Sequence, residues 1–167
     1  MISQTTEYAL RVIVHLASLD GKPATIQQIA KATLIPPGYL AKVLKGLSRA
    51  GLVISQRGLH GGSILARSPS KITVYEVVQS VAPLARILTC PLGLRTHGTK
   101  LCALHRRLDD AIAMVEAAFR KSTIADLLAE PNRSSPLCDT QRVAKNGPVS
   151  RRAAFSKPVP LSISRKA

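Results

Sequence analysis

The sequence predicts a mainly α-helical protein with one small β-hairpin and a long helix toward its C-terminal end. Three observations lead to this prediction. Apolar residues recur at three- and four-residue steps in several stretches, which is the period of an amphipathic helix. Short β-branched runs flank the glycine-rich residues 57–62, as they do in a hairpin. A helical period also continues over residues 101–119, which is long for a chain of 167 residues.

The N-terminal third contains three predicted helices. The first covers residues 6–19 and carries Leu10, Ile13, Val14 and Ala17 at helical spacing. The second begins at Thr25, which stands three residues before Gln28 in the spacing of a capping box, and continues through residue 32. The third covers residues 39–50 and ends before Gly51. Its apolar stripe is formed by Leu40, Val43, Leu44 and Leu47.

The second and third helices are joined by a short linker, residues 34–38, and so have the layout of a helix-turn-helix. Residues 52–56 and 63–66 are predicted to pair around residues 57–62 as a hairpin, or wing. Thr73 and Glu76 form a second capping-box match, which predicts a helix to about Val81. A last capped turn is expected from Thr123.

The chain is therefore divided into four parts. We expect residues 1–82 to form a winged helix-turn-helix domain for DNA binding, and residues 83–105, which carry Cys90, His97, Cys102 and His105, to form a cofactor or sensor loop. Residues 106–130 form a dimerisation helix and a final turn. The helical stretch 101–119 that supplies this helix has the apolar series Leu104, Leu108, Ala111, Ile112, Val115 and Phe119, with charged residues such as Asp109 and Glu116 between them. Residues 131–167 form a basic tail that is expected to be disordered.

The distribution of charge indicates a nucleic-acid partner. The net charge is +15, and no acidic residue lies between Asp20 and Glu76, where eight basic residues lie. A surface that is merely solvated usually mixes both signs, so this region has the footprint of a DNA-binding protein. On the third helix the basic side chains recur away from the apolar stripe. The candidate DNA-binding residues are Tyr39, Lys42, Lys45, Arg49, Arg57, Gly58, His60 and Gly61.

Composition and the N-terminus place the chain in the cytoplasm. Glu7, Arg11 and His15 interrupt the first apolar stretch, so neither a signal peptide nor a membrane span fits it. Three cysteines have no disulfide-framework spacing, and reduced thiols are available as ligands in that compartment. An enzyme is not expected, because no pocket-forming α/β pattern or orienting acid accompanies the cysteines. Cys138 is interpreted as a spare thiol in the tail.

Several motifs in order resemble those of a known family. Over residues 1–130 the chain is similar to the winged-helix regulators typified by IscR and NsrR, bacterial dimeric repressors that sense iron–sulfur status or nitric oxide. The matching stretches are Thr6–Arg11, Leu47–Val53, Arg57–Gly62, Ala66–Val78, the cysteine segment Cys90–His105 and Thr123–Leu128. The resemblance implies a homodimer that binds a palindromic promoter site on double-stranded DNA and regulates transcription, with repression as the expected sign.

The resemblance also implies a two-iron, two-sulfur (2Fe-2S) cluster held by cysteines of this segment. Cys90 and Cys102 match the first and last cysteines of the family, and His105 matches the histidine that follows the last one. Glu7 occupies the position of an acidic ligand that the partner subunit supplies in some relatives. The middle cysteine is absent, and the corresponding neighbourhood contains His97. Imidazole replaces thiolate in some iron–sulfur centres, so a mixed ligand set is chemically reasonable.

Two other chemistries fit the same residues. Cysteine and histidine together suit tetrahedral zinc. Cys90 and Cys102 could instead act as a metal-free reversible thiol pair. Glu7 could simply complement the dipole of its helix. A different class of function, an architectural DNA-binding protein dominated by its basic tail, is also compatible with the charge.

Overall fold

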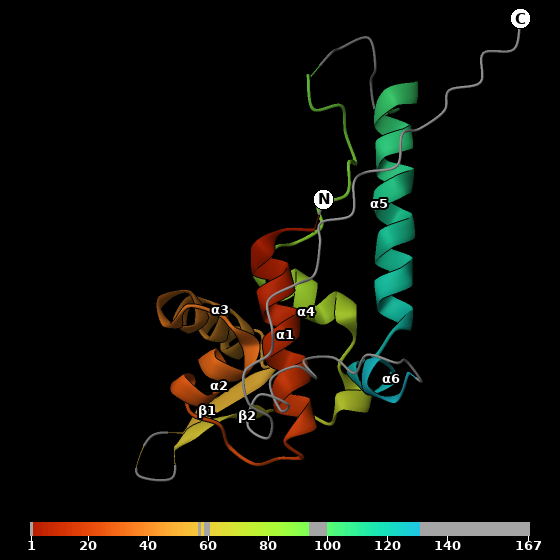
Figure 1. The fold of residues 1–167 in the computed structure, drawn as a ribbon. Helices are drawn as coiled ribbons and strands as arrows, with labels where there is room; N and C mark the ends of the chain where they lie inside the picture. The colour runs from red at the N-terminus through yellow and green to blue at the C-terminus, as the bar shows by residue number, and fades with distance from the viewer. Residues whose placement is uncertain (1, 57, 59–60, 94–99, 131–167) are drawn as a thin grey trace, which may run out of the picture.

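The computed structural model describes residues 2–56, 58, 61–93 and 100–130, and the fold follows from these (Figure 1). Three helices come first: α1 (Gln4–Ser18), α2 (Ile26–Thr33) and α3 (Pro37–Arg49). Strands β1 (Val53–Gln56) and β2 (Gly62–Leu65) form an antiparallel hairpin in which Val53 pairs with Leu65 and Gln56 with Gly62. A 3₁₀ turn, η1 (Pro69–Lys71), precedes α4 (Val74–Val81), and α5 (Ala103–Lys121) and α6 (Ile124–Ala129) follow.

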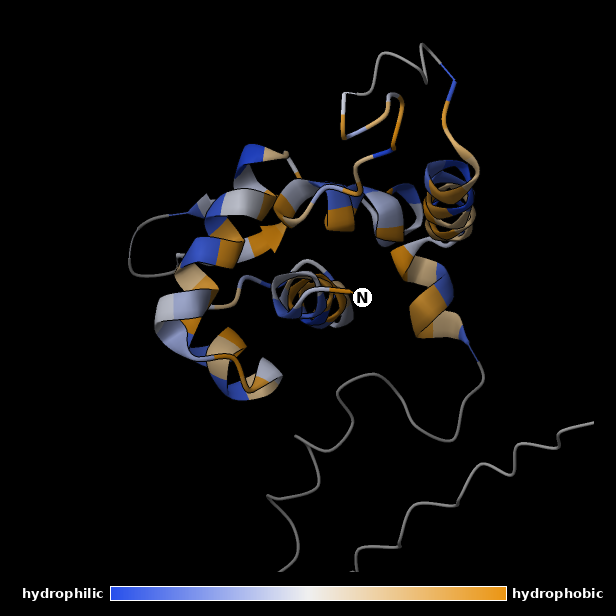
Figure 2. Ribbon diagram, turned by 90° about the horizontal axis from the view of Figure 1, so that it is seen from above, coloured by the Kyte–Doolittle hydropathy of each residue, from blue (hydrophilic) through white to orange (hydrophobic). Residues whose placement is uncertain are grey.

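Helix α1 is the centre of the N-terminal body. It contacts α2, α3, α4, α6 and β2, and in Figure 2 it is seen end-on with the other elements around it. Its buried residues are Thr6, Ala9, Val12, Ile13, Val14 and Leu16, whereas Leu10 and Ala17 are only partly buried. Leu10 and Ala17 nevertheless pack against the core, so the buried arc of α1 includes the predicted stripe and is wider than it, as expected for a helix packed on several sides.

The expected local signals are present. Thr25 and Gln28 form a capping box at α2, and Thr73 and Glu76 form one at α4. At the end of α3, Gly51 has φ +68° and the Leu52 N–H donates to the Leu47 carbonyl over 3.0 Å. This is the left-handed cap that a glycine accepts without strain. The mainly helical fold with a two-stranded wing is thus confirmed.

Helix α5 lies beside this body and is not enclosed by it (Figures 1 and 2). Phe119, near its C-terminal end, packs against the core, and Asp109 is the buried residue of the helix. Leu104, Leu108, Met114 and Val115 remain exposed. Burial along α5 therefore does not follow its apolar pattern, since Asp109, a charged residue between the apolar positions, is buried while several of those apolar residues are not.

Candidate nucleic-acid interface and sensor segment

Helix α3 presents two contrasting faces. Leu40, Val43, Leu44 and Leu47 are buried in the core. Tyr39, Lys42, Lys45 and Arg49 are all exposed, as the sequence predicted for side chains off the apolar stripe. None of the ion pairs among the described residues involves these three cations. Their charge is therefore not neutralised by described acidic side chains and is available to an anionic partner.

The start of α3 is fixed from two sides. Leu34, in the turn after α2, has φ +57°, and Pro36 accepts backbone hydrogen bonds from Tyr39 and Leu40 over 3.0 Å each. Arg11 of α1 donates to the Thr33 carbonyl over 3.2 Å and so satisfies the C-terminal end of α2. The Tyr39 ring meets the Tyr8 ring edge-on, with centroids 5.8 Å apart. The aromatic candidate at the start of α3 is thus held in place by α1.

A groove of about 530 Å³ runs between α3 and the hairpin. Lys45, Ser48 and Arg49 line it from α3, and Ser55, Gln56 and Ser63 line it from the strands. A smaller hollow on the other side of α3, about 310 Å³, is lined by Lys42, Lys45 and Arg49 together with Thr5 and Ser80. The basic stripe of α3 therefore borders hollows that offer hydroxyl and amide groups, which are suitable partners for phosphate and base edges.

The wing is tied to the connection between α1 and α2. Ala24 and Ser63 exchange backbone hydrogen bonds of 3.1 and 2.8 Å. At the tip, Gly58 is exposed with φ +115°, and the Gly61 N–H donates to the Gly58 carbonyl over 2.9 Å. Arg57 and His60 lie outside the described residues. Gly58 and Gly61 have no side chains, so a sugar–phosphate chain can approach the backbone of the tip closely.

The predicted ligands of the sensor segment are only partly brought together. Cys102 is the N-cap residue of α5, and its Sγ lies 3.3 Å from Nδ1 of His105, one turn along. Cys90 is half-buried. Glu7 lies in the first turn of α1 with 53% of its side chain exposed and pairs with Arg11. Within the described part of this chain no three His, Cys, Asp or Glu side chains gather into a metal-binding group, and His97 lies outside that part.

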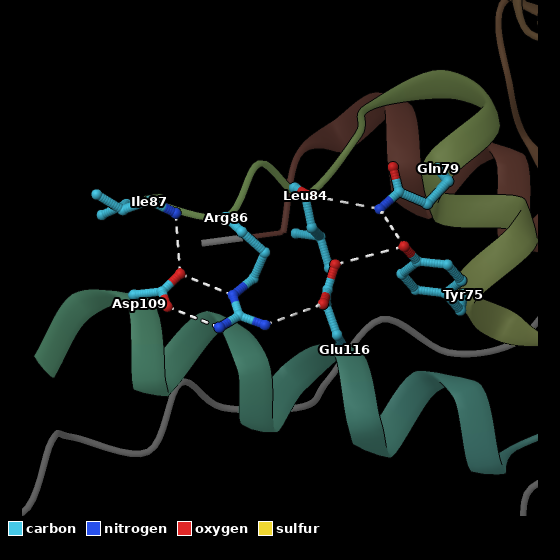
Figure 3. Close-up of polar contacts among 7 residues, drawn as sticks. All are labelled: Tyr75, Gln79, Leu84, Arg86, Ile87, Asp109 and Glu116. Carbon is cyan, nitrogen blue, oxygen red and sulfur yellow. Dashed lines mark hydrogen bonds and ion pairs between the residues drawn. The ribbon is translucent and has the colours of Figure 1, made fainter. Parts of the chain in front are cut away.

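A polar cluster that the sequence did not predict connects the segment before Cys90 to α5 and α4 (Figure 3). The Arg86 guanidinium donates to both carboxylate oxygens of Asp109 over 2.7 and 2.6 Å, and the Ile87 N–H donates to the same carboxylate over 2.9 Å. The hydrogen bonds from Arg86 lower the pKa of Asp109 to about 2. The residues are separated by more than twenty positions, so helical spacing alone gave no signal for the pair.

A helix-turn-helix with a basic second helix, followed directly by a hairpin wing, defines a winged-helix transcriptional regulator. Comparison with known proteins agrees. Residues 2–130 match the model of the Rrf2 family, described as iron-dependent transcriptional regulators. The chain belongs to the Rrf2 family. This membership confirms the resemblance inferred from the motifs and agrees with the expectation that the chain is not an enzyme.

Individual relatives support the same assignment. An Aquifex aeolicus protein that bears the description HTH-type transcriptional regulator is 30% identical over 131 residues, which are 77% of this chain and 91% of that protein. The structure of CymR, the global cysteine regulator of B. subtilis, is similar with a TM-score of 0.64 at 25% identity, covering 79% of this chain and 98% of CymR. The structure of T. potens IscR is similar with a TM-score of 0.63 at 25% identity, covering 79% of this chain and 88% of that IscR chain.

Among the helices that the structure describes, none combines the length and the hydropathy that a membrane span requires.

Proposed function

We propose that this protein is a homodimeric regulator, most simply a repressor, that binds a palindromic promoter site through α3 and the wing. The observation that carries the proposal is the exposed row of Lys42, Lys45 and Arg49 beside the groove between α3 and the hairpin. Phosphate contacts from these cations supply affinity, and contacts from Tyr39 and the groove to base edges supply specificity. Arg57, Gly58, His60 and Gly61 are assigned to the same role in the wing.

Helix α5 supports the dimeric part of the proposal. A helix of 19 residues that leaves Leu104, Leu108, Met114 and Val115 exposed is unfavourable in water unless another surface covers it. A second copy of the same helix offers a complementary apolar face by two-fold symmetry. A two-fold dimer then presents two α3 helices to two half-sites, which is why the proposed DNA site is a palindrome.

DNA binding is tested by fluorescence anisotropy of the full chain on labelled duplexes at several salt concentrations. In the proposed dimer, the double substitution Lys42→Ala with Lys45→Ala removes two phosphate contacts from each subunit, four in all. The slope of log affinity against log salt should therefore become shallower by about 4. Lys121→Ala, at the end of α5, makes a cationic control that should leave both affinity and slope unchanged. An unchanged slope in the double variant would contradict the assignment to α3.

The same assay separates regulation from architecture. A regulator prefers a fragment of its own promoter over a mixed-sequence duplex of equal length, whereas an architectural protein dominated by its basic tail binds both equally. Loss of the preference on replacing Tyr39 with Ala, with non-specific affinity retained, would place base recognition at the start of α3. Equal affinity for both duplexes at every salt concentration would favour the architectural function instead.

We further propose that residues 90–105 form a sensor that takes a metal or iron–sulfur group. The supporting geometry is the Cys102–His105 pair at the start of α5, two soft donors 3.3 Å apart. These residues fit such a group only in part, since Cys90 and either His97 or a partner subunit's acidic residue at the position of Glu7 must complete the set. A 2Fe-2S cluster is the first candidate, and the group would act by favouring one position of the segment over another.

The sensor is tested by purifying the full chain without oxygen and measuring iron, sulfide, zinc and the absorption spectrum. Iron and sulfide in equal amounts, lost in Cys102→Ala, would support the cluster. Zinc without sulfide would support a zinc site. If neither iron nor zinc is bound, and if DNA affinity changes on reversible thiol oxidation, Cys90 and Cys102 would act as a metal-free thiol pair. Glu7→Ala, His97→Ala and His105→Ala then identify the ligand that replaces the missing thiolate.

A further inference from the structure

Helix α5 is fixed to its own chain by an ion pair near its middle. Asp109 is 9% exposed, and its carboxylate accepts hydrogen bonds from Nε and Nη2 of Arg86 and from the Ile87 N–H. A bidentate ion pair, in which a guanidinium donates two hydrogen bonds to one carboxylate, restricts both distance and orientation, whereas an apolar contact restricts mainly distance. The stretch 84–93, called the arm below, is therefore held against α5 at one defined point, four residues before Cys90.

The contact continues from the arm into α4. Arg86 also lies 3.8 Å from the Glu116 carboxylate, and the other oxygen of Glu116 accepts a hydrogen bond of 3.4 Å from the Tyr75 hydroxyl (Figure 3). Gln79, one turn further along α4, donates to that hydroxyl over 2.9 Å and to the Leu84 carbonyl over 3.4 Å. The arm, α5 and α4 thus share one set of hydrogen bonds in which each group has a partner.

Helix α4 in turn packs directly on α3, the helix proposed to bind DNA. Gly46 faces Val81 and Ser80 so closely that a Cβ built on it would lie 3.3 Å from Val81 Cγ1 and 3.4 Å from the Ser80 carbonyl oxygen. Because Gly46 has no side chain, Val81 and Ser80 lie close to the backbone of α3, and a shift of α4 has little free space before it moves α3. The path from the arm to the DNA-facing helix therefore consists of close contacts throughout.

We propose that Arg86 and Asp109 are positioning residues that fix the arm with Cys90 against the helix that begins at Cys102, and that Glu116 and Tyr75 pass movements of the arm to α4 and α3. The first half of the proposal is independent of any cofactor. The second half rests on the proposed DNA-binding function. This path would couple the sensor segment to DNA binding at α3. Such coupling is reciprocal, so DNA bound at α3 must also affect the arm.

Hydrogen exchange of the reduced full chain, followed by mass spectrometry, tests the first half. Asp109→Asn removes the charge-assisted bonds and should raise the exchange rate of peptides from residues 84–93 by about tenfold. Asp110→Asn, the adjacent exposed carboxylate, should leave it unchanged, and Asp109→Glu should restore part of the protection. Equal exchange in wild type and Asp109→Asn overturns the proposal, as does an equal effect of Asp110→Asn.

A general loss of folding would appear as faster exchange in peptides from α1 to α3 as well. Arg86→Lys then decides the question, because it keeps the charge on an exposed residue but cannot make the bidentate ion pair. Selective acceleration of residues 84–93 in that variant supports the proposal. Unchanged exchange of residues 84–93 in Arg86→Lys overturns it.

Adding a mixed-sequence DNA duplex at low salt tests the second half. DNA bound at α3 should slow exchange of the arm in wild type, and Asp109→Asn should abolish this effect. Tyr75→Phe keeps the ring under Arg120 but removes the hydroxyl, so it should leave exchange of the free arm unchanged and weaken the response to DNA. DNA that protects α3 but not the arm overturns the coupling. Absence of DNA binding instead contradicts the proposed function and leaves the test of the ion pair intact.

Discussion

Gly62 shows how one residue positions the wing. Its place at the start of β2 lies against the backbone of Ala24, and a Cβ built on it would lie 2.9 Å from both the carbonyl carbon and the carbonyl oxygen of that residue. Side-chain flexibility cannot relieve such a contact, because the atoms it meets are backbone. The requirement for glycine here comes from close approach between two segments rather than from an unusual backbone angle.

We expect Gly62→Ala to lower the free energy of unfolding by about 1–3 kcal/mol, because the hairpin must move away from Ala24. Gly38→Ala is the matched control. A Cβ at Gly38 meets nothing within 4 Å, and alanine is the better residue in a helix, so that variant should be neutral or slightly more stable. Urea denaturation followed by circular dichroism measures both. Equal stability of the two variants would contradict the close contact.

The ion pair of Asp109 gives the stability of the protein a dependence on acid. Its pKa falls from an ordinary 3.8 to about 2, mainly through the hydrogen bonds from Arg86. The pair therefore stabilises the fold fully above pH 3.8 and loses its effect as the pH falls toward about 2. Asp109→Asn should flatten this acid limb of the free energy of unfolding, whereas Asp110→Asn should keep it. An unaltered limb in Asp109→Asn would show that other carboxylates dominate.

Among the elements, the starts of α4 and α6 depend on each other. Each has a capping box, formed by Thr73 with Glu76 and by Thr123 with Asp126. The two threonines also face each other in an antiparallel bridge, in which the Val74 N–H donates to the Ser122 carbonyl and the Ile124 N–H to the Ile72 carbonyl over 2.9 Å each. Helix α6, only six residues long, is therefore held to the N-terminal body at its first turn.

Thr123→Ala should cost about 1 kcal/mol of folding free energy, since it leaves a helix N–H without its side-chain acceptor. Thr123→Ser keeps the hydroxyl and should retain most of the stability. Thermal unfolding of both variants beside the wild type makes the comparison. A Ser variant as unstable as the Ala variant would indicate that the lost methyl group, and not the cap, is responsible.

At the scale of the whole molecule, α5 carries an apolar face that the described residues of its own chain leave uncovered. Leu108 is 48% exposed and Met114 68% exposed. In the proposed dimer these side chains lie between two copies, and the basic faces of both α3 helices are available to one DNA duplex. Within the part of the chain that the structure describes, the core around α1 is closed, whereas apolar side chains along α5 remain exposed.

Placing a charge in this face should separate the dimer. We expect the wild type to sediment as a dimer, and Leu108→Glu combined with Met114→Glu to sediment as a monomer, because a carboxylate buried at the interface would lack a partner. The control is Arg106→Glu combined with Ala117→Glu, which places two carboxylates at exposed positions on the side of α5 opposite Leu104, Leu108 and Val115. Analytical ultracentrifugation distinguishes the states. A wild type that stays monomeric at high concentration would contradict the dimer.

Local sequence patterns by themselves predicted several helix ends, the nucleic-acid partner and the family of this protein. The capping boxes at Thr25 and Thr73 and the terminating Gly51 act over a few residues, so their pattern predicted where α2 and α4 begin and where α3 ends. The acid-free stretch before Glu76 likewise indicated DNA, because net charge does not depend on how the chain packs. The family assignment rested on motifs of the same local kind.

Only the tertiary structure decided which side chains meet across long separations. It widened the buried arc of α1 beyond the predicted stripe to include Thr6, Ala9 and Val12, because contacts on several sides and not periodicity set burial there. It joined Arg86 to Asp109 and buried this carboxylate on a helix that leaves Leu104, Leu108, Met114 and Val115 exposed. Pairing between residues far apart depends on the path of the whole chain, and helical spacing contains no information about that path.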